Sequence, residues 1–408
     1  MLQNNLKDMT KTEEFPNVQN WDDFDISPNL LRGIHGCGYE NPSPIQQKAI
    51  QPILSGRDVV AQAQSGTGKT AAFSIGALSK VEIELFKTQV LILSPTKELS
   101  TQTANVVTSL GNKMNGLLVE TAFGGQGHEP IQKLGQNQGQ KSGNMFLTKT
   151  CPHIICGCPG KVLDMLRRNK ILPRYLKLIV IDEVDEMLSS GFKDQLYYIF
   201  QFIGESIQIA LFSATMPPSI DSIVNKIVKN PVKILVESER LTLDGIQQFF
   251  VPIQDDEEKY ESLKNIFLYL SVSQCIIYCN GVNRVEDLYE AMSFDKYPVC
   301  RIHRNMSKEQ RHESFMDFKN GKSRVLISTN ITSRGIDIQQ VSVVINFDVP
   351  SCVDSYLHRI GRSGRWGRKG VGINFITERD VDHLRNVEKH YKCDIKQLPS
   401  ELNFLNSY

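Results

Sequence analysis

The chain has 408 residues, 40% apolar and 22% charged, with a formal net charge of +1. Its length exceeds what one ordinary hydrophobic core supports, so we expect two domains of a soluble globular protein. The near-zero net charge excludes a generally basic nucleic-acid-binding chain, and any such surface must be local. No apolar run approaches the ~20 residues of a membrane helix, and the polar start lacks the apolar core of a signal peptide.

Short apolar runs alternate with helical stretches along the chain. These runs are continuous rather than alternating in polarity, which is typical of parallel sheets covered on both faces. Two blocks of strand–helix alternation therefore predict two α/β domains. The predicted strands span residues 58–63, 89–95, 153–159, 176–183 and 208–215 in the first block, and 274–280, 324–330, 341–348 and 371–377 in the second.

The polar segment ESERLTLDG, residues 237–245, lies between the two blocks. We predict a polar N-terminal extension, a first domain, a linker and a second domain, with bounds 1–20, 21–237, 238–245 and 246–408. Residues 134–149 are rich in Gly, Gln, Asn and Ser and are predicted to form a long loop inserted between elements.

The segment AQAQSGTGKT, residues 61–70, has the pattern of a phosphate-binding loop between a strand and a helix. Glycines allow backbone N–H groups to surround phosphate oxygens, and the helix N-terminus adds a favourable dipole. Lys69 would reach the β- and γ-phosphates, and the Thr70 hydroxyl would bind Mg²⁺. An ordinary glycine turn is the plain alternative. The nucleotide-binding candidates here are Ser65, Gly66, Thr67, Gly68, Lys69 and Thr70.

Cysteines occur nine times at irregular spacings, which indicates reduced thiols in a cytosolic or nuclear protein. One cluster resembles a metal site: Cys151, His153, Cys156 and Cys158 in CPHIICGC. Because no second pair of ligands lies at zinc-like spacing, we interpret the cluster as a buried strand with small apolar thiols.

A second apolar run, from Leu176 to Ile181, ends in the acids Asp182 and Glu183. A phosphate loop needs a second strand that ends in a Mg²⁺-binding acid, and Asp182 is the candidate. Glu183 can orient or deprotonate the attacking water. Taken alone, both acids could equally be solvated side chains that cap the next helix.

The segment HRIGRSGRWGRKG, residues 358–370, contains five basic residues and no acid. Such a run indicates a solvated basic face or a nucleic-acid surface. The spacing of Arg362 and Arg365 also suits an arginine pair that reaches a γ-phosphate from a second domain.

Taken together, these motifs resemble those of the DEAD-box ATP-dependent RNA helicases, over nearly the whole chain and in the family's order. Stretches outside the motifs, such as LTLDGIQQFF (241–250), resemble the branch that serves eukaryotic translation initiation, although the splicing-linked and messenger-decay branches stay open. The matching motifs are GYENPSPIQ (38–46), AQSGTGKT (63–70), PTKELS (95–100), Gly124–Gly125, CPGK (158–161), DEVD (182–185), SAT (213–215), IIYCN (276–280), STNITSRGID (328–337) and HRIGRSGR (358–365).

The resemblance implies two RecA-like domains, each a mostly parallel sheet covered by helices on both faces, with ATP and Mg²⁺ as cofactors. By position, Gln46 would read the adenine edge, with Trp21 and Tyr39 packed near it. Asp337 would bond the ribose. The implied catalytic residues are Lys69, Asp182, Glu183, Arg362 and Arg365, with Thr70 and Asp182 at the metal.

Two further sets of residues carry over from the resemblance. One set would link nucleotide state to RNA binding and to the domain interface: Asp185, Ser213, Thr215 and His358. The other would contact the RNA backbone: Pro95, Thr96, Lys97, Gly124, Gly125, Pro159, Gly160, Lys161 and Thr329.

Five positions depart from the family pattern. Val184 replaces an Ala beside the catalytic acids, where overpacking costs about 1–3 kcal/mol if the site cannot relax; we expect hydrolysis to survive. Lys97 and Lys161 replace arginines and lose the bidentate fork. Cys158 replaces a Thr that would bond phosphate, and Asn330 replaces an Asp in the RNA-contacting segment, so RNA affinity is affected more than ATP binding.

The predicted function is an ATP-dependent RNA helicase that binds single-stranded RNA with little sequence preference and locally unwinds short duplexes in translation initiation. We expect a cytoplasmic monomer with a scaffold partner and no membrane association, with a nuclear location as the second possibility. Three alternatives stay open: an ATP-gated RNA clamp with weak hydrolysis, a DEAD-box helicase of nuclear RNA processing, and a DNA helicase or translocase. The adenine-reading segment around Gln46 argues against the last.

Overall fold

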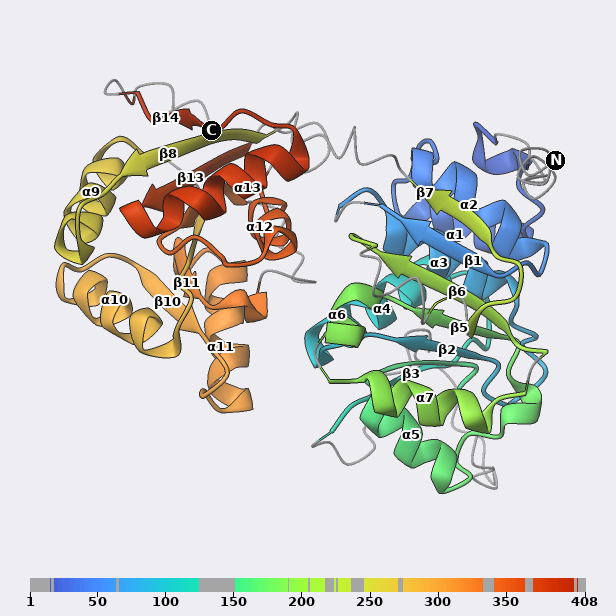
Figure 1. The fold of residues 1–408 in the computed structure, drawn as a ribbon. Coiled ribbons are helices and arrows are strands. Elements are labelled where there is room, and N and C mark those ends of the chain that lie inside the picture. The colour runs from blue at the N-terminus through green and yellow to red at the C-terminus, as the bar shows by residue number, and fades with distance from the viewer. Residues whose placement is uncertain are drawn as a thin grey trace, which may run out of the picture. The chain divides into compact units, whose positions relative to one another are not determined.

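The computed structural model describes residues 15, 18–63, 66–124, 151–189, 191–204, 206–216, 224, 227–235, 246–270, 274–332, 341–363, 370–399 and 402. The chain divides into two compact units, Met1–Leu235 and Val236–Tyr408 (Figure 1). The predicted linker and the predicted loop 134–149 lie outside the described residues.

The first unit is built on a seven-stranded parallel sheet in the order β3-β4-β2-β5-β6-β1-β7. The central strands are buried along their whole length and mostly apolar, as the continuous runs in the sequence predict. The strands are β1 (Val59–Gln62), β2 (Val90–Leu93), β3 (Val119–Ala122), β4 (Ile154–Gly157), β5 (Leu178–Ile181), β6 (Gln208–Ser213) and β7 (Val232–Leu235).

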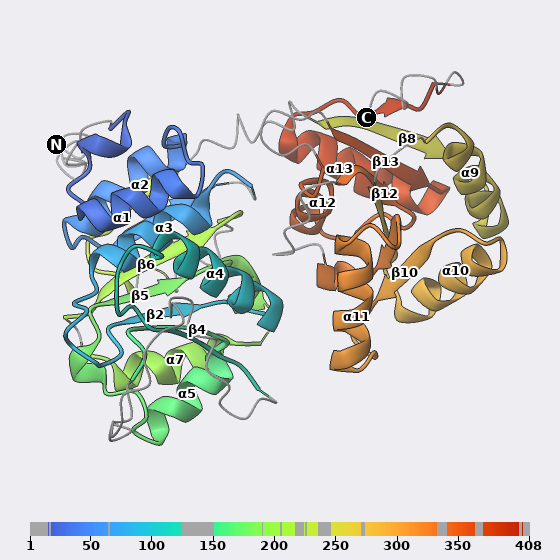
Figure 2. The same cartoon turned by 180° about the vertical axis from the view of Figure 1, so that it is seen from behind.

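Helices cover both faces of this sheet (Figures 1 and 2). Successive side chains of a strand point to opposite faces: Leu211 belongs to the core formed with α5, α6 and α7, whereas Phe212 packs edge-on against Phe73 of α3, with ring centroids 5.2 Å apart. The helices are α1 (Pro28–Gly36), α2 (Pro44–Leu54), α3 (Lys69–Ser79), α4 (Lys97–Leu110), α5 (Pro159–Arg167), α6 (Val184–Ser189) and α7 (Lys193–Phe202), with 3₁₀ turns at Trp21–Asp23 and Pro173–Tyr175.

The second unit has a seven-stranded parallel sheet in the order β10-β11-β9-β12-β13-β8-β14. Counted along each unit, this is the same strand order as in the first sheet. The strands are β8 (Ile246–Pro252), β9 (Gln274–Tyr278), β10 (Val299–Ile302), β11 (Val325–Ser328), β12 (Val341–Asn346), β13 (Gly370–Ile376) and β14 (Lys396–Gln397).

Helices again lie on both faces of the second sheet. Along β9, Cys275 and Ile277 share a core with α9 and α10, whereas Ile276 and Tyr278 share another with Phe318 of α11. The helices are α9 (Asp256–Tyr269), α10 (Val282–Phe294), α11 (Lys308–Lys319), α12 (Val353–Ile360) and α13 (Val381–Tyr391), with 3₁₀ turns at Asn330–Thr332 and Glu378–Asp380. The predicted fold class, two parallel-sheet α/β domains, is confirmed.

Each predicted strand run overlaps an observed strand, but β3, β7, β8, β10 and β14 were missed. Four of these are edge strands, and β8 lies next to an edge. Their residues are only partly buried, with patterns such as buried residues at every second position in β10. Such strands lack the continuous apolar run on which the prediction depended.

Candidate functional site

The predicted nucleotide residues meet at the carboxyl ends of three adjacent strands, β5, β6 and β1. Ile181 pairs with Leu211, and Gln62 pairs with Ser213, so the segments that follow these strands emerge side by side. The crevice outside the carboxyl ends of parallel strands is the usual ligand site of such sheets. The topology therefore brings together the glycine loop, the DEVD acids and the SAT segment.

The glycine loop has the backbone that only glycine adopts readily. Gly66 and Gly68 have φ of 85° and 101°, and Gly68 is the N-cap residue of α3, which begins at Lys69. A Cβ atom on Gly68 would lie 2.6 Å from Nε2 of Gln46. Glycine is thus required at position 68 both for conformation and for space. Ser65 lies outside the described residues, and Thr67 and Thr70 are partly exposed at this helix start.

Gln46 connects the first helices to the glycine loop. Its Oε1 accepts from the Ser43 N–H at 2.7 Å as part of the capping box of α2, and its Nε2 donates to the Gly68 carbonyl at 3.3 Å. Gln46 is buried, and its predicted role in adenine recognition stays a prediction. The structure shows in addition that it supports the loop.

The predicted adenine-packing aromatics also lie together. Trp21 is buried, and its ring is 6.2 Å from the Tyr39 ring in an edge-on arrangement. The indole Nε1 has no hydrogen-bond partner among the described residues. Buried indole N–H groups usually have a hydrogen-bond partner. This donor is therefore available to a ligand at the predicted adenine site.

Two buried charged side chains at the site each have an atom without a hydrogen-bond partner among the described residues. Lys69 and Glu183 are 6% and 4% exposed, and neither Lys69 Nζ nor Glu183 Oε2 has a hydrogen-bond partner within the described ranges. Burial, together with the charge of Glu183, raises the pKa of Asp182 to about 7, against the lowering effect of Lys69. A buried cation and two crowded acids fit a phosphate ligand accompanied by a metal cation, which would satisfy both signs of charge.

Glu183 has an unusual backbone, with φ of 53°. Its N–H donates to Oδ1 of Asp182 at 3.0 Å, and its carbonyl accepts from the Met187 N–H at 2.9 Å in the first turn of α6. A non-glycine residue in this region is uncommon and costs about 1–3 kcal/mol, and such residues cluster at functional sites. The turn places the carboxylates of two successive residues at the strand end.

Asp185 is joined directly to the SAT segment. Its Oδ2 accepts from Thr215 Oγ1 at 2.8 Å, and its N–H donates to Ser213 Oγ at 3.3 Å. Ser213 Oγ in turn donates to the Thr215 carbonyl at 2.7 Å. The three predicted coupling residues of this unit therefore form one buried network, although their coupling role itself stays a prediction.

Val184 points away from these polar groups. It is 3% exposed and belongs to the apolar core formed with Met187, Leu211 and the helices α5 and α7. The two extra methyl groups are thus accommodated by core packing rather than among the carboxylates.

The predicted RNA residues of the first unit follow β2, β3 and β4, which are neighbours in the sheet. Thr96 caps α4, its Oγ1 accepting from the Leu99 N–H at 3.2 Å, and Lys97 Nζ lies 5.0 Å from the centre of the Phe123 ring. Gly124 and Gly160 are exposed. Pro95, Pro159 and Lys161 belong to the same edge, whereas Gly125 lies outside the described residues.

The cysteine–histidine cluster has the structural role that we predicted. The buried His153 uses both ring nitrogens, because Nδ1 accepts from the Leu118 N–H at 3.0 Å and Nε2 lies 3.0 Å from the Ile83 carbonyl. Burial lowers the pKa of His153 and raises that of Cys158, whose Sγ is 3.7 Å from Ser100 Oγ. Within the described part of the chain, no group of three His, Cys, Asp or Glu residues could hold a metal ion by itself.

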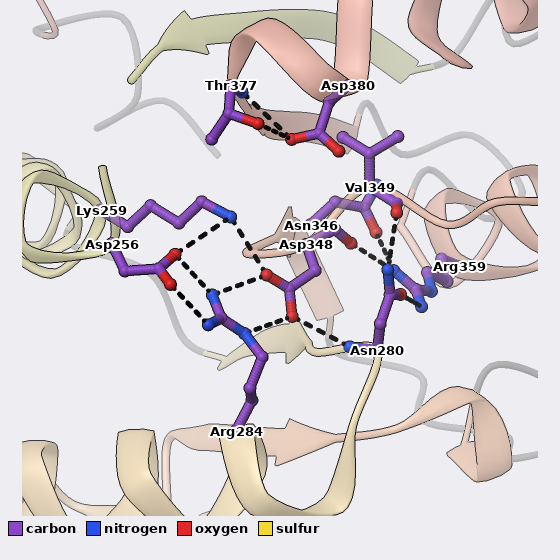
Figure 3. Close-up of polar contacts among 10 residues, drawn as sticks. All are labelled: Asp256, Lys259, Asn280, Arg284, Asn346, Asp348, Val349, Arg359, Thr377 and Asp380. Carbon is purple, nitrogen blue, oxygen red and sulfur yellow. Dashed lines mark hydrogen bonds and ion pairs between the residues drawn. The ribbon is translucent and has the colours of Figure 1, made fainter. Parts of the chain in front are cut away.

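For residues 358–370 of the second unit, the sequence left open a solvated basic face, a nucleic-acid surface or an arginine pair at a γ-phosphate, and the first of these is wrong for Arg359 and Arg362. Arg359 is fully buried and Arg362 is 2% exposed. Arg359 donates to Asn280 Oδ1 at 2.7 Å and to the Asp348 carbonyl at 2.7 Å (Figure 3). It also donates to Asn330 Oδ1 at 2.7 Å. Burial lowers its pKa to about 10. The amphipathic α12 turns Arg359 inward, and Arg362 follows just after the end of this helix.

The structure places the remaining predicted residues of this unit as follows. Thr329 directly follows β11, and His358 is buried on α12. Asp337 and Arg365 lie outside the described residues. Their predicted roles are not tested.

Sequence reasoning missed an ion-pair network around the buried Asp348. Lys259 Nζ lies 3.1 Å from Asp348 Oδ1, and Arg284 contacts both Asp348 and Asp256 at 2.8–2.9 Å (Figure 3). Asp348 follows an apolar run in the same way as Asp182 does, so this signal could have identified it.

Family models match both units of the chain. The DEAD/DEAH box helicase model matches residues 43–223, and the helicase conserved C-terminal domain model matches residues 258–367. The protein named ATP-dependent RNA helicase eIF4A from Lodderomyces elongisporus is 44% identical over 388 residues, covering 95% of this chain and 94% of the relative. The chain is a DEAD-box helicase.

Other relatives and solved structures agree with this assignment. ATP-dependent RNA helicase fal1 from Schizosaccharomyces pombe is 42% identical over 395 residues, with 97% of each chain covered. The structure of Saccharomyces cerevisiae Dbp5 bound to RNA and ADP BeF₃ matches with a TM-score of 0.84 and 31% identity, covering 94% of this helicase and 96% of Dbp5. Among the described helices of this helicase, none has the length and apolar character to cross a membrane.

Proposed function

We propose that this DEAD-box helicase hydrolyses ATP in the first unit and uses the cycle to bind and locally unwind RNA in translation initiation. The observation that carries the proposal is a pair of buried atoms, Lys69 Nζ and Glu183 Oε2, that have no hydrogen-bond partner among the described residues; they follow β1 and β5, the strands on either side of β6. Relatives that match nearly the whole chain carry the name of an initiation-factor helicase.

The residues around the glycine loop have distinct proposed roles. Bound ATP would supply the γ-phosphoryl group that is transferred to water, with Mg²⁺ offsetting its charge. Lys69 and the loop N–H groups would hold the phosphates, Thr70 and Asp182 would hold the metal, and Glu183 would orient the water and accept its proton. The Lys69 ammonium, which has no hydrogen-bond partner in the described ranges, and the crowded carboxylates support this assignment.

The proposal includes residues of the second unit. Arg362 and Arg365 would stabilise charge on the γ-phosphate, His358 would act at the domain interface, and Asp337 would bind the ribose. If ATP and RNA each bind residues of both units, each must strengthen the binding of the other. The bonds of Asp185 to Ser213 and Thr215 support a connection between the two sites.

RNA binding would use backbone contacts at the ends of β2, β3, β4 and β11. Such contacts carry no base information, so we propose little sequence preference. We further propose that the protein acts as a cytoplasmic monomer with a scaffold protein of the initiation machinery. The alternative of an RNA clamp with weak hydrolysis rests on the departures from the family pattern, which are Lys97, Cys158, Lys161, Val184 and Asn330.

The deciding experiment is ATP hydrolysis by the purified chain with and without single-stranded RNA, beside Glu183→Gln. We expect hydrolysis to rise strongly with RNA and to be abolished in the variant. ATP-dependent RNA binding without turnover in the unsubstituted protein would contradict the helicase and favour the clamp. A stronger stimulation by DNA than by RNA would contradict the RNA assignment.

A further inference from the structure

Helix α7 exposes three aromatic side chains that its packing does not need. Leu196 and Ile199 face the core and are 3% and 0% exposed. On the outer side, Tyr197, Tyr198 and Phe202 are 61%, 44% and 42% exposed. Large exposed apolar rings gathered on one helix usually mark a binding surface. We call these three residues the α7 aromatic face.

The rings of the α7 aromatic face lie beside an arginine of α5. The Tyr197 and Tyr198 rings are 5.8 Å apart and inclined by 67°. The Arg167 guanidinium lies 5.5 Å from the centre of the Tyr198 ring. An aromatic pair next to an exposed guanidinium presents flat surfaces on which nucleic-acid bases can stack.

The charge around this face is positive. Residues 159–170 and 193–202 contain five basic and two acidic residues, a local net charge of +3, although the whole chain carries only +1. Positive charge attracts the phosphate backbone irrespective of sequence. The basic residues are Lys161, Arg167, Arg168, Lys170 and Lys193, and the acids are Asp164 and Asp194.

The α7 aromatic face also adjoins the predicted RNA contacts of the first unit. Helix α5 begins at Pro159 and Gly160, and a Cβ atom on Gly160 would lie 3.5 Å from Gln195 Oε1 of α7. The nine residues of α5 separate Pro159 from Arg167 by about 13 Å. A strand of roughly four nucleotides spans this distance at ~3.4 Å per nucleotide.

We propose that the α7 aromatic face and Arg167 form an additional binding surface for single-stranded RNA, adjoining the backbone contacts at Pro159 and Gly160. Bases stack on the tyrosine rings, so the surface accepts any sequence and lengthens the RNA segment that the protein holds. This inference rests on the proposed RNA-binding function. If a protein partner bound these rings instead, removing them would not change the affinity for RNA of either length.

The test compares RNA of two lengths on the full chain. Oligouridines of about six and about fifteen nucleotides, near the two ends of common site sizes, are titrated in the presence of ATP with the double variant Y197A/Y198A. We expect affinity for the longer RNA to fall about tenfold per stacked base lost and affinity for the shorter RNA to stay unchanged. Phe294→Ala is the matched control, because Phe294 is an 87% exposed aromatic of the second unit.

Two further variants separate stacking from charge. Y197F/Y198F keeps the rings and should keep the affinity for the longer RNA, and R167A should reduce the slope of log affinity against log salt by about one. If Y197A/Y198A binds both RNAs as the unsubstituted protein does, the proposal is overturned. If the unsubstituted protein binds neither RNA, the proposed function fails as well.

Discussion

The two sheets have the same strand order, yet they use equivalent positions in opposite ways. The fourth strand of each sheet, β5 in the first unit and β12 in the second, is followed by an acid, Asp182 or Asp348. The sixth strand of each sheet, β1 or β8, is followed by a helix that carries a lysine, Lys69 or Lys259. Each unit thus places an acid and a lysine at the carboxyl edge of its sheet.

The difference lies in whether these charges find partners within the chain. In the second unit, Lys259 Nζ lies 3.1 Å from Asp348, and Arg284 adds two contacts. Burial alone would raise the pKa of Asp348, but the bonds from Arg284 and Asn280 and the charge of Lys259 hold it below its usual value. In the first unit, Lys69 Nζ has no such bond among the described residues, and the pKa of Asp182 is raised.

The same topology can thus leave these charges for a ligand, as we propose for the first unit, or pair them with one another, as in the second. A glycine loop before α3 leaves space and N–H groups for a phosphate, whereas α9 is capped by Asp255, whose side chain accepts from the Glu258 N–H. The second unit fills the equivalent edge with its own ion pairs.

The largest expected effect is that of Lys69→Ala. Because Lys69 is the buried cation assigned to the phosphates, ATP hydrolysis should fall by at least about a hundredfold, as for lost electrostatic stabilisation of a transition state. The melting temperature should not fall, since a buried charge without an internal partner is removed. Steady-state hydrolysis and thermal unfolding of the same preparation check both points. A variant that keeps its activity would contradict the assigned site.

The corresponding substitution in the second unit, Arg359→Met, removes a buried cation that has internal partners. Here we expect the free energy of unfolding to fall by about 3–5 kcal/mol, because the acceptors on Asn280, Asn330 and Asn346 lose their buried donor. Denaturant unfolding followed by a probe in the second unit measures the change. Arg359→Lys, which keeps a charge but not the planar fork, should recover only part of it. Equal stability of both variants and the parent would refute this role.

Asp348→Asn should change how stability depends on pH. Since the folded-state pKa of Asp348 is below its unfolded value, its stabilisation is present above about pH 4 and is lost as pH falls through the folded-state pKa. We expect the variant to be about 2 kcal/mol less stable at pH 7 and the difference to shrink below pH 4. Melting temperatures across pH 3 to 7 test this. A difference that stays constant down to the lowest pH would show that the carboxylate charge is not responsible.

The smallest effect on activity is expected for Val184→Ala. Because Val184 packs in the apolar core rather than among the carboxylates, RNA-stimulated hydrolysis should change less than about threefold, under one kcal/mol of activation free energy. The unfolding free energy should fall by about 1–2 kcal/mol through the loss of two buried methyl groups. A large gain in hydrolysis would instead show that the valine crowds the acids.

The sequence by itself determined the parts that depend on local pattern. Continuous apolar runs identified the central strands, and the glycine loop with the strand-ending acids Asp182 and Glu183 identified the candidate nucleotide site. These signals are readable because buried parallel strands and phosphate-binding loops each impose a composition on a few consecutive residues.

Only the tertiary structure decided which charges are partnered. The run from Arg359 to Lys369 has the composition of a solvated basic face, but α12 buries Arg359 among Asn280, Asn330 and Asp348. These partners lie 11 to 79 residues from Arg359 along the chain. Likewise, the local sequence does not show that Lys259 has a carboxylate partner at 3.1 Å, because that contact depends on which strands become neighbours in the sheet.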